Sequence, residues 1–278
     1  MIRTADNDLE ILYNYYLGIK EDEFSGGPFE EVELNNYTKT QKPTHNNSCR
    51  IESRLTYFMI DFYGKNGFPQ VVSDKVYSEK LGEQTTLYRG EWRKEFAQNL
   101  VNDQTYHFGA GASGEGIYLT DDKERADVYS SFGGLGDVVE YKIHPNAKII
   151  SLNETKEIKK YVVAKIQEKT SNKKPFLGLF AGKKVKSPVK DSVKKQKLDE
   201  LVDFLININD SELTKCFTDD SEFYGSNLLA VYLGYDCVKR THCVENLSNV
   251  TDYIVLNRNA LILRESEYNR LMGEENHK

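Results

Sequence analysis

Three short stretches carry side chains whose types could support chemistry: LYRG with Arg89, GEGIYLT with Tyr118, and TDYIVLN with Asp252. A guanidinium group can donate two hydrogen bonds at once to phosphate or ribose oxygens. An aromatic ring stacks on a planar group, and a carboxylate stabilises a growing positive charge. Each residue also has a plain structural explanation: a surface ion pair, a half-buried strand aromatic, and a turn or cap, respectively. Taken singly, none of the three indicates a function.

A second tyrosine, Tyr129, follows Tyr118 by eleven residues in the stretch GEGIYLTDDKERADVYSSFG. This stretch predicts a short apolar strand that turns directly into a helix, with Thr120 or Asp121 at the start of the helix. The glycine-rich run FGAGASGEG leads into the strand. The two tyrosines are therefore expected on either side of one strand-to-helix corner.

Together, and in this order, these stretches resemble the ADP-ribosyltransferase superfamily over about residues 85–264. LYRG resembles the first motif of that family. GEGIYLTDDKERADVYSS resembles the segment of poly(ADP-ribose)-polymerase-type members in which a second tyrosine follows at the same spacing. VVEYKIHPNAKII is similar to the strand pair between motifs, and GYDCVKR followed by TDYIVLNRNALIL is similar to the strands of the third motif.

The resemblance implies an α+β fold with an ADP-ribosyltransferase-like split antiparallel β-sheet core. We expect a mainly helical N-terminal region over residues 1–84, a catalytic domain over 85–268 and a polar tail over 269–278. A helical, lysine-rich insertion is expected at about 154–210 within the catalytic domain.

The resemblance also implies NAD as the co-substrate and assigns the site residues. Arg89, Tyr118 and Asp252 would be catalytic, with Asp252 accepting a hydrogen bond from a ribose hydroxyl. The expected NAD-binding set is Arg89, Gly90, His107, Tyr118 and Tyr129. Tyr118 and Tyr129 would flank the nicotinamide, Arg89 would anchor phosphate or ribose oxygens, Gly90 would let the carboxamide approach, and His107 would contact the adenosine side.

Three positions depart from the family pattern. Asp252 stands where the family has glutamate, Arg89 where polymerase-type members have histidine, and Ala126 where serine is usual. The site is thus a mixed Arg–Tyr–Asp set, which fits a divergent branch of the family or an inactive relative.

The function that follows from the resemblance is mono-ADP-ribosylation of a protein or nucleic acid, with release of nicotinamide, by a toxin or effector. NAD hydrolysis with water as acceptor, and a catalytically inactive protein of the same fold that binds a nucleotide or a partner, remain alternatives. An RNA phosphotransferase of related fold would need more histidine and arginine residues than this chain has.

One segment differs in composition from the rest. Residues 169–197 contain ten lysines and one aspartate. The segment is explained either as a surface loop kept soluble by lysine or as a contact for an acidic partner. In the second case Lys183, Lys184 and Lys186 would dock the acceptor, and the N-terminal helical region would hold NAD, recognise the target or bind a neutralising partner.

Composition bounds the remaining choices. The net charge of −6 argues against nucleic-acid binding over the whole surface, without excluding a local basic patch. The sequence contains neither a membrane-length apolar run nor a signal-peptide pattern, so we expect the protein in a cytoplasm, its own or that of a target cell. Cys237 and Cys243 flank His242, but without a CxxC pair we expect small, half-buried strand cysteines and no metal site.

Periodicity and turn residues predict the other elements. Helices are expected at 8–18, 48–64, 73–81, 154–169 and 193–208. Strands are expected in GDVVEYKI and AKIIS. Near the C-terminus, SNLLAVYLGYDCVKR predicts a helix, a glycine stop and a strand, and DYIVLNRNALILRE predicts two strands or one bent strand with a turn at 257–259.

Overall fold

The computed structural model describes most of the chain and shows an α+β protein. The described residues are 5–25, 47–103, 109–111, 114–131, 136–171, 186–219, 226–242 and 250–273. The helices are α1 Ala5–Ser25, α2 Asn47–Phe62, α3 Asp74–Glu79, α4 Lys94–Asn102, α5 Lys123–Ser131, α6 Leu152–Ser171, α7 Ser192–Ile208, α8 Ser211–Thr218, α9 Ser226–Tyr232, α10 Glu265–Met272 and the short 3₁₀ helix η1 Arg258–Ala260. The strands are β1 Gln70–Val72, β2 Leu87–Glu91, β3 Gly109–Gly111, β4 Gly114–Thr120, β5 Asp137–Ile143, β6 Ile149–Ser151, β7 Cys237–His242, β8 Val250–Val255 and β9 Leu261–Arg264.

The strands form one mixed sheet in the order β1-β9-β5-β2-β4-β8-β7-β6, with β3 paired to β4 outside this path. The β1–β9 and β6–β7 pairs are parallel, and the other pairs are antiparallel. The sheet is therefore antiparallel in its centre, where the predicted site residues lie, and parallel toward both ends.

The centre of the sheet is nearly divided in two. β2 pairs with β5 along its whole length, and β4 pairs with β8 from Ile117 to Thr120. Between β2 and β4 the register contains the single pair Tyr88–Thr120. Strands β1, β9, β5 and β2 thus form one half-sheet, and β4, β8, β7 and β6 form the other.

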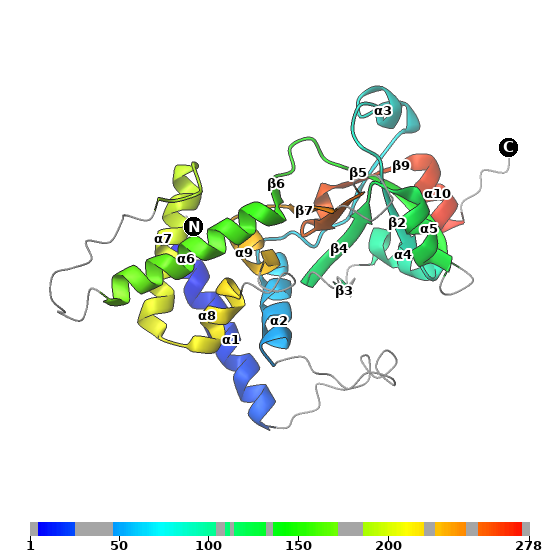
Figure 1. The fold of residues 1–278 in the computed structure, drawn as a ribbon. Coiled ribbons are helices and arrows are strands. Elements are labelled where there is room, and N and C mark those ends of the chain that lie inside the picture. The colour runs from blue at the N-terminus through cyan, green and yellow to red at the C-terminus, as the bar shows by residue number, and fades with distance from the viewer. Residues whose placement is uncertain are drawn as a thin grey trace.

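Helices gather at the two ends of this sheet (Figure 1). α1, α2, α6, α7, α8 and α9 lie together beside β6 and β7, whereas α3, α4, α5 and α10 lie around β2, β5 and β9. α2 contacts α8, α9 and β4, and α1 contacts α7. The N-terminal helices therefore share one hydrophobic core with the helices that follow β6 and with the sheet.

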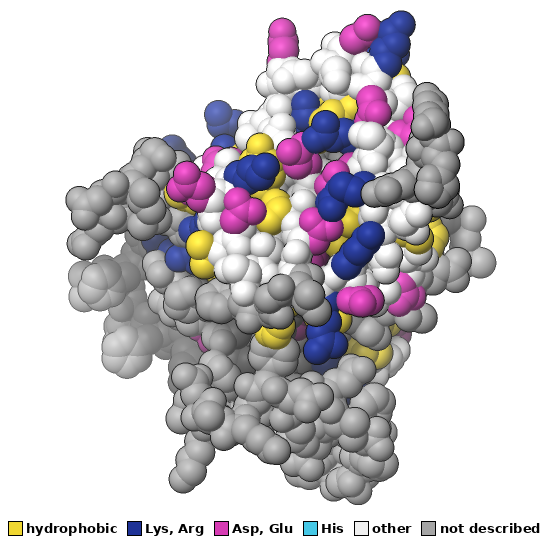
Figure 2. Space-filling model, turned by 90° about the vertical axis from the view of Figure 1, so that its right-hand side faces the viewer, with side chains coloured by type: hydrophobic (Ala, Val, Ile, Leu, Met, Phe, Trp, Pro, Cys, Tyr) yellow, Lys and Arg dark blue, Asp and Glu magenta, His cyan; other side chains and the backbone are white. Residues whose placement is uncertain are grey.

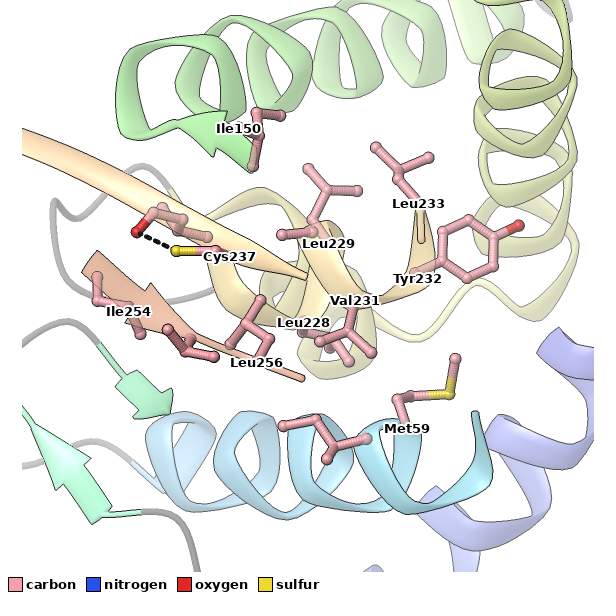
Figure 3. Close-up of a cluster of buried hydrophobic side chains, with 14 of the residues drawn as sticks. Met59, Ile150, Leu228, Leu229, Val231, Tyr232, Leu233, Cys237, Ile254 and Leu256 are labelled. Carbon is pink, nitrogen blue, oxygen red and sulfur yellow. Dashed lines mark hydrogen bonds between the residues drawn. The ribbon is translucent and has the colours of Figure 1, made fainter. Parts of the chain in front are cut away.

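Helix α9 is the centre of that core. Every residue of α9 is buried, and Figure 3 shows its side chains between α2, α6 and strands β7 and β8. Met59 from α2, Ile150 from β6 and Leu256 after β8 surround it. A helix that is apolar on all sides belongs in a core, and the last five residues of α9, LLAVY, have this composition.

The sequence predicted most of these elements and missed several. The helices expected at 8–18, 48–64, 73–81, 154–169 and 193–208 are α1, α2, α3, α6 and α7, with ends that differ by up to seven residues. The helix before Gly234, the strand after it (β7), the strand pair around η1 (β8 and β9) and the strands expected in GDVVEYKI and AKIIS (β5 and β6) are also present. α4, α8 and α10 were not predicted.

Asp236, in the predicted GYDCVKR stretch, joins three parts of the chain. Its carboxylate accepts hydrogen bonds from the Lys65 ammonium at 2.9 Å, the Lys148 backbone N–H at 2.8 Å and the Asn257 side chain at 2.8 Å. Burial alone would raise the pKa of Asp236, but these donors hold it below its usual value. The carboxylate thus fixes the starts of β6 and β7 against the end of β8.

Glu115 is a buried carboxyl group at the start of β4, with 6% of its surface exposed. The Asn227 side chain of α9 donates to the Glu115 carbonyl at 2.8 Å, which ties α9 to β4 at this residue. Burial raises the pKa of Glu115 to about 7, and a hydrogen bond with Ser53 of α2 opposes this shift. The Glu115 side chain is therefore neutral in the folded protein below neutral pH.

Glu115→Gln should change how stability depends on pH. The folded-state pKa lies above the unfolded value of 4.5, so the folded protein holds the proton more tightly and the native chain loses stability as the pH rises from 4.5 to 7. This loss is at most about 3 kcal/mol, and the glutamine variant should not show it. Urea unfolding at pH 5 and pH 8 measures the difference. The exposed Glu83→Gln variant is the control, and an equal pH dependence in native protein and Glu115→Gln would contradict the prediction.

Candidate active site at the divided centre of the sheet

Tyr118 and Asp252 lie on neighbouring antiparallel strands. Tyr118 is opposite Ile254, and Thr120 is opposite Asp252. Residues that face each other across a ladder project to the same side of the sheet, as do alternate residues of one strand. Tyr118 and Asp252 therefore project from the same face of the β4–β8 pair, as diagonal neighbours offset by two residues along the strands. The structure thus brings two of the three predicted catalytic residues together.

Arg89 lies on β2, across the gap between the half-sheets. Tyr88 is opposite Thr120, so alternation directs Arg89 to the other face of its strand. Its Nη1 nevertheless donates to the Tyr118 carbonyl oxygen at 3.1 Å, and its Nε donates to the buried carboxylate of Glu91. Arg89 therefore links β2 to the strand that carries Tyr118, and Glu91 holds it in this position.

Gly90 is the place where α5 packs directly on β2. A methyl group at this position would lie 2.0 Å from the carbonyl oxygen of Ala126 and 2.9 Å from the backbone nitrogen of Ser130. The close contact requires glycine whether or not a ligand is bound. The expected approach of a carboxamide to the Gly90 backbone remains a prediction.

Helix α5 is also fastened to β8 at its first turn. The Asp121 backbone N–H donates to the Thr251 carbonyl at 3.1 Å, and the Asp121 carboxylate accepts from the Thr251 N–H at 2.8 Å. The Asp122 carboxylate accepts from the N–H groups of Glu124 and Arg125 at 3.0 and 3.3 Å. Asp122 thus caps the helix, where the sequence pointed to Thr120 or Asp121, and Asp121 instead connects α5 to the strand of Asp252.

Tyr129 lies in the second half of α5 and is 48% exposed. It is one helical turn after Arg125, on the same side of the helix. The predicted helix and its eleven-residue offset from Tyr118 are present, and α5 contacts both β2 and β4. Its ring is therefore exposed on a helix that lies beside the strand of Tyr118.

Arg125 is a site residue that the sequence did not indicate. Its Nη2 lies 3.2 Å from the Asp252 carboxylate, in an ion pair whose side chains are 30% and 17% exposed, respectively. Apart from its i, i+4 spacing from Tyr129, nothing in the sequence distinguishes Arg125 from the other charged residues of its helix.

The remaining predicted residues are not part of this constellation. His107, Lys183 and Lys184 lie outside the described residues. Lys186 is exposed, in the segment that precedes α7. Of the other lysines in the 169–197 segment, Lys169 pairs with Asp203 at 2.5 Å and Lys197 donates to the Tyr232 carbonyl at 3.0 Å, so both contribute to the packing of α7.

Surface charge is mixed on the part of the molecule that carries α5 and α10. Figure 2 shows basic and acidic side chains interspersed on this face, with scattered apolar groups between them. Arg270 of α10, for example, pairs with Asp137 at 2.6 Å and with Glu267 at 2.8 Å. This described face therefore presents no broad field of one sign.

The expectations about cysteines, metal ligands and membrane spans can be compared with the described residues alone. Cys237 is buried in β7, whereas Cys243 lies outside the described residues. Within the described ranges, no three histidine, cysteine or acidic side chains gather as metal ligands would. None of the described helices has the length and apolar character needed to cross a membrane.

Comparisons of the chain with models of protein families, with curated proteins and with solved structures give no match. The functional interpretation therefore depends on the residues and geometry described above.

Gly90→Ala should destabilise the fold by about 1–3 kcal/mol, because its methyl group would meet backbone atoms of α5 that cannot turn away. Gly18→Ala is the matched control. Gly18 is in α1 with no atom near the added methyl group, so this change should be neutral or stabilising by up to about 1 kcal/mol. Urea unfolding measures both, and an unchanged midpoint in Gly90→Ala would mean that α5 is not held against β2 as described.

Proposed function

We propose that the protein is an NAD-dependent mono-ADP-ribosyltransferase, which transfers ADP-ribose to a protein or nucleic acid and releases nicotinamide. The observation that carries the proposal is the common face of Tyr118 and Asp252 on neighbouring strands, beside the helix that bears Tyr129. An aromatic residue and a carboxylate are thereby placed close together. In cleavage of the nicotinamide–ribose bond the first can hold the nicotinamide and the second can stabilise the positive charge that develops on the ribose.

The bond between nicotinamide and ribose breaks through a state with positive charge at the anomeric carbon, as in glycoside hydrolysis. In our proposal Tyr118 and Tyr129 hold the nicotinamide ring by stacking. The Asp252 carboxylate accepts a hydrogen bond from a ribose hydroxyl and stabilises the growing charge. The sequence assigned phosphate or ribose oxygens to Arg89, and its contact with the Tyr118 carbonyl adds a role in placing that tyrosine.

We propose further that the sheet is the split sheet of an ADP-ribosyltransferase-like fold. An ADP-ribosyltransferase-like split sheet would leave a cleft for NAD between its halves. In support, β2 and β4 share one register pair, whereas each pairs more extensively with its other neighbour. Of the predicted site residues, Arg89 and Gly90 lie on β2 and Tyr118 on β4, at this division, and Asp252 lies on β8, next to β4.

A binding protein without catalytic activity is the second candidate, and one observation favours it. Asp252 is engaged by Arg125, and aspartate replaces the longer glutamate of the family. A carboxylate held by arginine cannot accept the ribose hydroxyl with the same atoms. NAD hydrolysis with water as acceptor is the third outcome that the experiment below separates.

The biological setting proposed is that of a toxin or effector. The acceptor would be a protein or a nucleic acid, docked by Lys183, Lys184 and Lys186, and a neutralising partner is part of the same proposal. Among these lysines Lys186 is the one within the described residues, where it is exposed.

Asp252→Asn should lower nicotinamide release about a hundredfold or more, because it removes the charge that stabilises the transition state while leaving the side-chain size unchanged. The assay uses NAD labelled on the adenine side together with cell extract, and protein and nucleic-acid fractions are resolved separately. Asp127→Asn is the matched control, because Asp127 is exposed on α5 close to the site. Thermal melting confirms that each variant is folded.

Label that enters one fraction, and does not enter it with Asp252→Asn, would support the transferase and identify the class of acceptor. Nicotinamide release without labelled product would support NAD hydrolysis. Full activity of folded Asp252→Asn would exclude Asp252 as the catalytic carboxylate. No turnover by the native protein would favour the binding protein.

A further inference from the structure

Arg125 lies on a helix that is attached to strands of both half-sheets. Its helix is pinned to β2 by the close packing of Ala126 and Ser130 on Gly90. The same helix is tied to β8 by the two backbone and side-chain hydrogen bonds between Asp121 and Thr251. The base of the Arg125 side chain therefore has little freedom to move relative to either half-sheet.

The guanidinium group of Arg125 is directed at Asp252 and is not fully buried. It lies 3.2 Å from the Asp252 carboxylate, and 30% of the Arg125 side chain remains exposed. A solvent-accessible arginine beside a carboxylate can exchange that partner for another anion at modest cost, since partly exposed ion pairs contribute little net stability. Arg89 is placed differently, because its Nε and Nη1 groups contact Glu91 and the Tyr118 carbonyl.

The order of groups in NAD relates these residues to one another. The nicotinamide is joined to a ribose, and the same ribose carries the pyrophosphate. If Tyr118 and Tyr129 hold the nicotinamide and Asp252 meets the ribose, the pyrophosphate lies close to the group that contacts Asp252. Arginine is the side chain best suited to two oxygens of one phosphate.

We propose that Arg125 anchors the pyrophosphate of the nucleotide and releases Asp252 as it does so. The inference rests on the proposed function and moves the phosphate contact from Arg89 to Arg125. One guanidinium then serves two anions in turn: the Asp252 carboxylate in the free protein and the pyrophosphate in the complex. Binding of the nucleotide thereby withdraws Arg125 from the carboxylate, whose oxygen can then accept from the ribose hydroxyl.

The test is a double-mutant cycle on the binding of ADP-ribose, measured by titration calorimetry without turnover. Arg125→Met should weaken binding about tenfold to a hundredfold through loss of a charged hydrogen-bond donor. Arg125→Lys keeps the charge but not the paired donors, so its affinity for ADP-ribose should lie between those of native protein and Arg125→Met. Nicotinamide alone should bind native protein and Arg125→Met equally. Lys123→Met is the control for charge, because it removes a charge from the exposed face of the same helix, and it should bind ADP-ribose as native protein does.

Asp252→Asn supplies the second arm of the cycle. It removes the charged acceptor of the ribose hydroxyl in either background, but beside Arg125 it also spares the separation of the ion pair. Its effect on ADP-ribose binding should therefore be several-fold more favourable in the native background than in the Arg125→Met background. An equal effect in the two backgrounds would show that Arg125 does not exchange Asp252 for the nucleotide, and would overturn the proposal.

Two further results distinguish this inference from the proposed function. Tight binding of ADP-ribose by native protein and equally tight binding by folded Arg125→Met would overturn the role of Arg125 and leave the nucleotide site intact. Failure of native protein to bind NAD, ADP-ribose and nicotinamide would overturn both. Thermal melting of each variant separates loss of binding from loss of the fold.

Discussion

The direct packing of α5 on β2, which a glycine at position 90 permits, is the constraint on which the candidate site depends. With a side chain at that position the helix would have to move away from the strand. Arg125 and Tyr129 would then move with it, and the ion pair between Arg125 and Asp252 would open. The fastening of Asp121 to Thr251 completes the arrangement, because it fixes the first turn of the same helix to the strand of Asp252.

The packing of α5 on β2 matters because the sheet is nearly divided between β2 and β4. Between β2 and β4 the ladder is reduced to the Tyr88–Thr120 pair, so side chains and α5 must hold the two halves at this point. Arg89 of β2 crosses the division and donates to the Tyr118 carbonyl, whereas Arg125 of α5, a helix that packs on β2, reaches the Asp252 carboxylate on β8.

Much of this architecture was accessible from the sequence, because local signals specify it. The strand-to-helix corner at Tyr118, the periodic helices α1 and α2, and the glycine stop at 234 follow from spacing and turn residues. The contacts that define the site were not accessible. The Arg125–Asp252 pair joins residues far apart in the chain, and Arg89 is held by a glutamate two positions away, whose role depends on strand alternation and burial. Helices α4 and α10 are short, and they were not predicted from the sequence.

The most direct test of this account is a crystal structure of the native protein soaked with ADP-ribose and nicotinamide together. We predict that the nicotinamide ring lies between the rings of Tyr118 and Tyr129, and that the ribose adjoining it lies within hydrogen-bonding distance, about 3 Å, of the Asp252 carboxylate. A nicotinamide ring bound away from both tyrosines, or a ribose that does not contact Asp252, would contradict the assignment of this site.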